Sequence, residues 1–213
     1  MSKVLILGAA GQIARHAITQ FLGQEGVGLT LYLRQSERLR KLAGDRVAVI
    51  EGDVMDTRHL QAVAKGHDVV YANLAGDDIE AQAKSTVAAL EAAGVRRLIW
   101  ISTLGIYDEV PGTFGKWNHQ MLDGGYLEPY SAAARVIESS KLDYTIVRPA
   151  WLTDRDEVDY ELTRKGEPFK GTEVSRKSVA DLVVKLAQDP ARDVRGSVGI
   201  DKPGTDGDKP AWY

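Results

Sequence analysis

The chain has 213 residues, of which 44% are hydrophobic, so it is long enough and apolar enough to fold around one sizeable core. Its formal net charge of −3 argues against a nucleic-acid or anionic-membrane surface, and no apolar run is long enough to span a membrane. With no cysteine and no metal-ligand spacing among its four histidines, the chain is expected to be a cytoplasmic protein without disulfides, a thiolate nucleophile or a metal.

The first predicted strand leads into a glycine turn. Val4–Leu7 are consecutive apolar residues, which indicate a strand buried on both faces. Gly8 and Gly11 follow, and then apolar residues at helical spacing predict a helix over about 11–24. Such a turn lets the backbone approach a pyrophosphate, which the free N–H groups of the helix bind. We expect a positive φ at Gly11, and a plain strand-to-helix turn is the alternative interpretation.

Strands and helices alternate along the chain as far as Pro149. Further strands are predicted over 28–33, 46–50, 68–71, 97–102 and 144–148. Helices are predicted near 36–43, after Asp56, from Ile79 to Gly94, and over 127–140, with a loop over about 103–115. This alternation predicts an α/β fold, a Rossmann-type doubly wound parallel sheet in the order 3-2-1-4-5-6, whose switch point lies beside the first strand.

The C-terminal third is less regular. Ser175 is predicted to cap a helix that Pro190 closes, and residues 201–213 are rich in Gly, Pro and Asp. We see no internal repeat and predict a single NAD(P)-binding Rossmann domain over 1–213, with a small irregular C-terminal substrate region.

The end of the second strand predicts which cofactor the site takes. Rossmann-type sites usually place an acid about 20 residues after the glycine motif, where it holds a ribose 2′-OH. Here that position is Arg34, and Arg38 follows four residues later. A guanidinium holds a 2′-phosphate in a bidentate fashion, whereas a carboxylate repels it. The sequence therefore favours NADP(H) over NAD(H), with a solvated strand-end arginine as the alternative.

Two other strand ends face the same edge of the predicted sheet. Asp53 follows the third strand and would face the adenine, although Gly-Asp is also a common turn pair. Asn73 to Gly76 follow the fourth strand and would lie against the ribose and phosphates, where Gly76 permits close approach. A strand-ending turn is the alternative for this second segment.

These stretches together resemble the atypical short-chain dehydrogenase/reductase superfamily. The features that carry the resemblance are the glycine turn, Arg34, Gly52-Asp53, Ile101-Ser102-Thr103, Asp143 to Pro149, and Glu173 to Arg176. The branch they resemble is the NAD(P)H-binding, NmrA-like group that includes flavin/biliverdin reductase-like proteins. The resemblance covers roughly residues 3–200 and is specific for fold and cofactor rather than for substrate.

The resemblance implies a role for each part of the site. Residues 8–14 would hold the pyrophosphate, Arg34 the 2′-phosphate, and Asp53 would lie by the adenine. Ser102 and Thr103 would flank the nicotinamide, and Pro149 to Trp151 would lie along its carboxamide. The cofactor-binding residues expected are Gly8, Gly11, Gln12, Ile13, Arg34, Asp53, Val54, Asn73, Leu74, Ala75, Gly76, Ser102, Thr103, Pro149, Ala150 and Trp151.

The sequence departs from the superfamily at its catalytic pair. Catalytically competent members usually carry Tyr-x-x-x-Lys on the helix after the fifth strand, where the Lys cation stabilises tyrosinate. Tyr130 stands in the expected place, but Ala134 occupies the lysine position. Arg135 is one residue further, about 100° round the helix. Ser102 and Tyr130 are the candidate catalytic residues, and a pocket or core aromatic is the alternative role of Tyr130.

The substrate side is expected near 104–119 and 151–175. Tyr107, Trp117, His119 and Trp151 could stack a planar ring, or they could close a small core. We predict an NADPH-dependent oxidoreductase that transfers hydride to a small planar or carbonyl acceptor such as a quinone or flavin, working as a monomer or homodimer. The alternative is a non-catalytic NADP(H)-binding redox sensor that acts through a protein partner. Nucleotide-sugar epimerase or dehydratase chemistry is disfavoured by the short chain and the missing Tyr/Lys pair, and hydrolase chemistry by the lack of a Gly-x-Ser-x-Gly motif.

Overall fold

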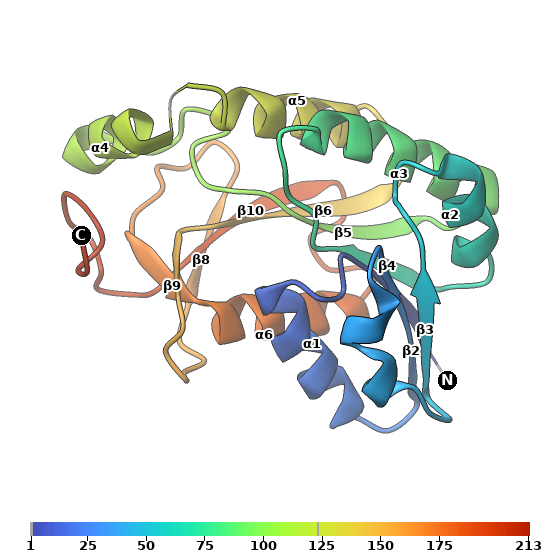
Figure 1. Cartoon of the computed structure of the whole chain (residues 1–213). Coiled ribbons are helices and arrows are strands. Elements are labelled where there is room, and N and C mark those ends of the chain that lie inside the picture. Colours follow the sequence, from blue (N-terminus) through green and yellow to red (C-terminus); the bar gives the residue numbers. More distant parts are fainter. Residues whose placement is uncertain (1, 123) are drawn as a thin grey trace.

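A twisted β-sheet runs through the computed structural model, which describes residues 2–122 and 124–213 (Figure 1). Within those residues the main sheet has eight strands. In spatial order they are β3 (Val47–Glu51), β2 (Val27–Leu33), β1 (Ser2–Leu7), β4 (Val69–Ala72), β5 (Arg97–Ile101), β6 (Asp143–Pro149), β10 (Gly196–Asp201) and β8 (Glu161–Arg164). The first six confirm the predicted order 3-2-1-4-5-6, and they pair in parallel.

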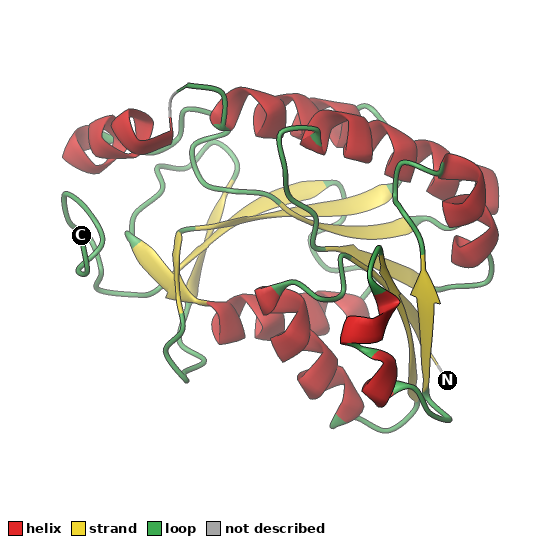
Figure 2. Cartoon of the chain, in the orientation of Figure 1, coloured by secondary structure: helices red, strands yellow, loops and turns green. Residues whose placement is uncertain are grey.

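Helices cover both faces of the sheet (Figures 1 and 2). One layer consists of α2 (Thr57–Ala64), α3 (Ile79–Ala93) and α5 (Leu127–Glu138), and the other of α1 (Gln12–Leu22) and α6 (Arg176–Gln188). Strand β1 is buried between the layers, because Val4 and Ile6 pack in the core on the α1 and α6 side while Leu5 and Leu7 pack in the core on the other side. The prediction of a strand buried on both faces is confirmed.

Local signals in the sequence mark several helix ends correctly. The Asp56 carboxylate accepts a hydrogen bond from the backbone N–H of His59 at 3.0 Å, which caps α2. The Ser175 hydroxyl accepts one from the N–H of Ser178 at 2.9 Å and caps α6. Helix α3 is followed by Gly94, whose φ of 75° lies in the left-handed region.

Two predictions between the strands need correction. The helix expected near 36–43 is a pair of 3-10 turns, η1 (Ser36–Arg38) and η2 (Arg40–Leu42), because Leu39 between them has a non-helical backbone and turns its side chain into the core. The loop expected over 103–115 ends early, since α4 (Gly112–Leu122) begins within it. Helix α4 buries Phe114 and Asn118 at helical spacing, a pattern that the preceding Pro and Gly residues obscured.

The C-terminal region adds strands that were not predicted. Strand β10 pairs in parallel with β6 and antiparallel with β8, while β7 (Trp151–Thr153) and β9 (Glu173–Ser175) form a small parallel sheet. Glycines weaken the strand signal of β10, but the Phe169 ring lies where a side chain at Gly199 would stand. Among the described residues, no helix is both long and apolar enough to cross a membrane.

Candidate functional site

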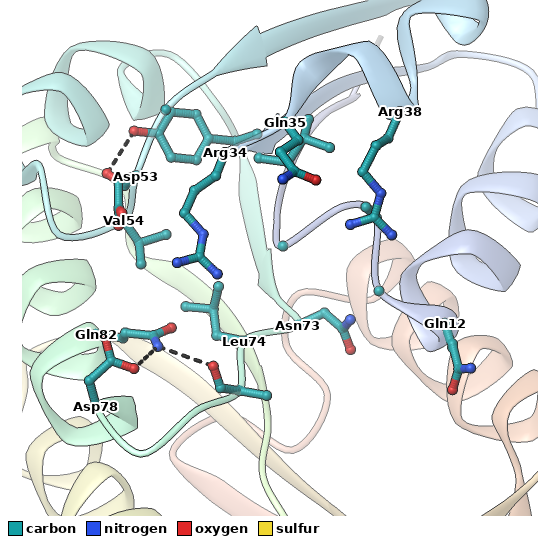
Figure 3. Close-up of a pocket in the computed structure, with 17 residues that line it drawn as sticks. Gln12, Arg34, Gln35, Arg38, Asp53, Val54, Asn73, Leu74, Asp78 and Gln82 are labelled. Atoms are coloured by element: carbon teal, nitrogen blue, oxygen red, sulfur yellow. Dashed lines mark hydrogen bonds between the residues drawn. The ribbon is translucent and has the colours of Figure 1, made fainter.

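A cavity of about 820 Å³ opens at the carboxyl ends of the strands, where the chain order reverses between β1 and β4 (Figure 3). Its walls come from the loops after β1, β2, β3 and β4 and from the start of α3. The lining residues are Gly8, Ala10, Gly11, Gln12, Tyr32, Leu33, Arg34, Gln35, Arg38, Gly52, Asp53, Val54, Asn73, Leu74, Ala75, Asp78 and Gln82.

The glycine turn packs directly on the loop after β4. A Cβ at Gly8 would lie 2.2 Å from the Asn73 carbonyl oxygen, and the φ of Gly8 is +67°. A Cβ at Gly11 would lie 2.0 Å from the Asn73 side-chain nitrogen, so both glycines allow a close approach of the two loops. The φ of Gly11 is −64°, so the expected positive φ was assigned to the wrong glycine. Gly11 provides no side-chain cap and the first turn of α1 holds no acid, which leaves that helix end suited to an anion.

Two arginines from the segment after β2 also line the cavity. Figure 3 shows the Arg34 side chain extending toward Leu74 and the Arg38 side chain on the side of Gln12. Both are exposed, and neither guanidinium forms an ion pair or a hydrogen bond with a residue that the structure describes. Their charges are therefore available to a ligand that carries a negative group. Arg40 differs, because the Glu37 carboxylate binds its guanidinium outside the cavity.

Hydrogen bonds and close packing hold the part of the wall formed by the ends of β2 and β3. The buried Tyr32 hydroxyl donates a hydrogen bond to the Asp53 carbonyl oxygen at 3.0 Å. A Cβ at Gly52 would lie 2.2 Å from that hydroxyl oxygen, so only glycine fits there. Burial, followed by the charges of Asp56 and Asp53, raises the pKa of Tyr32 to about 12, so the phenol stays protonated as a donor. The Asp53 carboxylate accepts from the N–H of Met55 at 2.9 Å, so Asp53 both lines the cavity and closes a turn.

The start of α3 contributes side chains that the sequence analysis missed. Gln82 is buried, and its amide nitrogen donates to the Ala75 carbonyl at 3.2 Å and to the Asp78 carboxylate at 2.6 Å. These bonds hold the loop after β4 against the helix, next to Leu74 and Val54 (Figure 3). The four-residue spacing of Asp78 and Gln82 at the edge of the sheet is the signal that could have found them.

The residues expected around the nicotinamide lie further along the same edge. The N–H of Ser102 bonds to Val147, that of Leu104 to Pro149, and that of Ala150 to Ile200, so the ends of β5, β6 and β10 meet there. The predicted residues Ile13, Gly76, Ser102, Thr103, Pro149, Ala150 and Trp151 are not among those that line the described cavity. The Ser102 hydroxyl is buried and has no hydrogen-bond partner among the described residues.

Tyr130 lies on the inner face of α5. It is 5% exposed, and its ring stacks on that of Tyr126 with the centroids 4.8 Å apart. Burial and Tyr126 raise the pKa of the Tyr130 phenol far above its usual value, while a hydrogen bond with the backbone of Gly76 offsets this in part. Ala134 is also buried, so no cation stands at the lysine position.

Known proteins share the sequence pattern and the fold of this chain. The profile of a protein family described as NAD(P)H-binding matches residues 8–190. The chain belongs to this NAD(P)H-binding family. A Rossmann-fold NAD(P)-binding family protein from Shigella flexneri is 45% identical, with all of each chain covered and a TM-score of 0.85. A short-chain dehydrogenase/reductase from Veillonella parvula, solved in complex with NADP, is 33% identical, with 99% of each chain covered and a TM-score of 0.92.

A third solved structure shares the fold. ChuY, an anaerobilin reductase from Escherichia coli O157:H7, is 21% identical, with a TM-score of 0.80 over 97% of this chain and 100% of its own. The resemblance to the atypical short-chain dehydrogenase/reductase superfamily is therefore confirmed for the family and the fold.

The structure divides the four aromatic residues expected at the substrate side. Trp117 and Trp151 pack with their ring centroids 4.8 Å apart, and Tyr213, which the sequence analysis did not place, contacts both rings edge-on. Tyr107 lies apart from this cluster, because its hydroxyl bonds to Glu138 at 2.8 Å and Lys165 covers its ring. The His119 imidazole lies 3.1 Å from the Asp108 carboxylate.

Proposed function

We propose that this protein is an NADPH-dependent oxidoreductase that transfers hydride to a small planar or carbonyl acceptor, such as a quinone or flavin. The observation that carries the proposal is a pair of guanidinium groups, Arg34 and Arg38, which line the switch-point cavity beside the glycine turn and have no ionic partner among the described residues. An NAD-specific site would be expected to hold a carboxylate at position 34.

The residues of the cavity fit NADPH. Gly8 and Gly11 let the turn pack closely against Asn73, and the N-terminus of α1 suits the pyrophosphate. Arg34 and Arg38 would hold the 2′-phosphate, and Val54 and Leu74 offer apolar contact to the adenine. The NADP in the related structure from Veillonella parvula supports the same choice of cofactor.

The proposed chemistry requires little from the protein beyond position. When bound, NADPH supplies a hydride. The chain's part is to bind the acceptor at the carboxyl ends of β5 and β6 and to exclude water there. The buried Ser102 hydroxyl can donate a hydrogen bond to an acceptor oxygen. A quinone that accepts hydride needs one further proton to become a hydroquinone, and solvent can supply it, so Tyr130 need not act as an acid.

A second function is favoured by one specific observation. Tyr130 is buried without a lysine partner, as expected of a protein that binds NADP(H) without turnover. Such a protein would act as a redox sensor that signals through a protein partner.

One experiment separates the two functions. Cofactor affinity is measured by fluorescence titration, and NADPH consumption is then followed against a panel of quinones, flavins and aldehydes. Turnover that saturates with acceptor supports the oxidoreductase, and tight NADPH binding without turnover supports the sensor. Failure to bind NADPH would refute both functions.

A further inference from the structure

Helix α3 holds together two of the loops that form the wall of the switch-point cavity. The Ser85 hydroxyl donates a hydrogen bond to the Val54 carbonyl oxygen at 2.5 Å, which fixes the loop after β3. One turn earlier, the Gln82 amide donates to the Ala75 carbonyl oxygen at 3.2 Å, which fixes the loop after β4. Residues three apart share one face of a helix, so Gln82 lies between these two loops and lines the cavity together with Val54 and Leu74 (Figure 3).

Two bonds determine which way the Gln82 amide faces. Its nitrogen donates to the Asp78 carboxylate at 2.6 Å as well as to the Ala75 carbonyl, and both of these groups are only acceptors. The nitrogen must therefore face them, and Figure 3 shows the amide oxygen on the side away from Asp78. Asp78 directly precedes α3, but its side chain does not cap the helix, so its carboxylate serves to orient Gln82 instead.

The oxygen Oε1 is the polar atom that Gln82 presents to the cavity. The residue is only 7% exposed, yet it belongs to the cavity lining, and its amide nitrogen is bonded on the protein side. Oε1 itself forms no hydrogen bond with a residue that the structure describes. Because an amide oxygen can only accept, a ligand group that bonds to Gln82 must be a donor.

A purine with an amino group suits this part of the cavity. Val54 and Leu74 offer apolar contact to a flat ring, and Gln82 adds one acceptor beside them. The 6-amino group of adenine is a donor, whereas the 6-oxo group of hypoxanthine or guanine is an acceptor. An oxygen that can only accept stabilises the first and repels the second. Asp53, expected beside the adenine from the sequence, already uses one carboxylate oxygen for the N–H of Met55.

We propose that Gln82 is a specificity-determining residue of the cofactor site, and that its Oε1 accepts a hydrogen bond from the 6-amino group of adenine. Asp78 is the positioning residue that fixes the amide. The inference rests on the proposed function for its cofactor and names the side chain that distinguishes adenine from a 6-oxopurine. This recognition of the base is independent of Arg34 and Arg38, which would bind the 2′-phosphate.

The test compares two dinucleotides that differ in the purine alone, with a 6-amino group in one and a 6-oxo group in the other. Calorimetric titration measures the Kd of NADP⁺ and of its hypoxanthine analogue for each variant. We expect the unmodified protein to bind NADP⁺ roughly tenfold more tightly, the effect of about one hydrogen bond. Gln82→Met keeps the length of the side chain but removes the acceptor, so the two Kd values should come within about twofold of each other. Asp78→Ala leaves the amide free to turn, and a smaller fall in the preference is expected.

Gln61→Met on α2 is the matched control, because the Gln61 amide also donates to a backbone carbonyl, that of Ala92 at 3.5 Å, and Gln61 does not line the cavity. It should leave the preference unchanged. General damage to the site weakens both dinucleotides alike, so the ratio of their Kd values separates recognition from a merely structural role. If Gln82→Met does not fold, Asp78→Ala decides, and a lower preference supports the proposal while an unchanged one overturns it.

Three other results would overturn the proposal. One is equal affinity of the unmodified protein for the two dinucleotides. Another is a full preference for NADP⁺ in folded Gln82→Met. The third is a preference that Asp53→Ala abolishes and Gln82→Met retains, which would assign recognition of the amino group to Asp53.

The outcome is separable from that of the proposed function, because binding of NADP⁺ requires no acceptor. A base preference that depends on Gln82, without NADPH oxidation by any acceptor of the panel, would leave this inference standing and refute hydride transfer. Turnover with the same kcat and KM for NADPH and for its hypoxanthine analogue would do the reverse.

Discussion

Replacing Arg34 and Arg38 should abolish the preference for NADPH over NADH. Both guanidinium groups reach the cavity, and neither has a described ionic partner that would compete for a phosphate. A charge-assisted hydrogen bond contributes about 1.5–3 kcal/mol, or roughly ten- to a hundredfold in Kd. Because both side chains are exposed, screening by salt favours the lower end, about tenfold for each arginine.

The two losses should not simply add. Arg34 and Arg38 would share one phosphate, so the double variant should lose less than the product of the single losses. NADH lacks this phosphate, and its Kd should stay within about twofold of the wild-type value in all variants. Arg40→Ala is the matched control, since Arg40 is close in sequence but is bonded to Glu37 outside the cavity.

The assay is fluorescence titration of NADPH and NADH at low and at physiological ionic strength. The preference for NADPH should shrink as salt rises, because it depends on exposed charges. Equal affinities for the two cofactors in the unmodified protein would refute the reasoning. So would a double variant that keeps the full preference, since the 2′-phosphate would then be bound elsewhere.

Four further variants test other steps. Gly8→Ala should lower the free energy of unfolding by more than about 2 kcal/mol in thermal melts, because Gly8 has a left-handed backbone and the new Cβ would also collide with Asn73. Gly26→Ala is the control, since Gly26 has a positive φ but open space around it, and it should lose only about 1–2 kcal/mol. Similar losses in the two variants would contradict this reasoning. Gly11→Val should fold by circular dichroism but fail to bind NADPH in the titration, and normal binding would contradict the role of the turn. Tyr130→Phe should lower kcat less than tenfold, under about 1.4 kcal/mol, and a thousandfold loss would make Tyr130 the acid. Burial raises the pKa of Asp201 from 3.8 to about 6, so the folded state holds the proton more tightly and its stability falls as pH rises from about 4 to 6. In chemical denaturation Asp201→Asn should flatten that fall and add about 1–3 kcal/mol to the free energy of unfolding at pH 7. A pH profile like that of the unmodified protein would contradict this prediction.

The sequence by itself was enough to predict the frame of the cofactor site. The apolar run of β1, the glycines after it and the capping residues Asp56 and Ser175 are local signals, each read within a few positions. Alternation of strands and helices then limits the sheet to very few orders, because parallel crossovers are right-handed. Arg34 could be placed at the mouth of the site for the same reason, since it ends a strand beside the switch point.

The tertiary structure decided what the strand and helix pattern leaves open. Arg38 faces the cavity, whereas Arg40, two residues later, pairs with Glu37, and only the path of the chain around the buried Leu39 distinguishes them. Strand β10 exists because β6 and β8 pair with it from both sides, although its own glycines argue against a strand.

The proposed acceptor side depends most on long-range contacts. Trp117, Trp151 and Tyr213 lie far apart in the chain and meet only in the fold, which leaves Tyr107 elsewhere. The buried Ser102 hydroxyl, which has no hydrogen-bond partner among the described residues, is likewise a property of its surroundings. Whether a buried polar atom has a partner depends on segments distant in sequence, and no local pattern of residues carries that information.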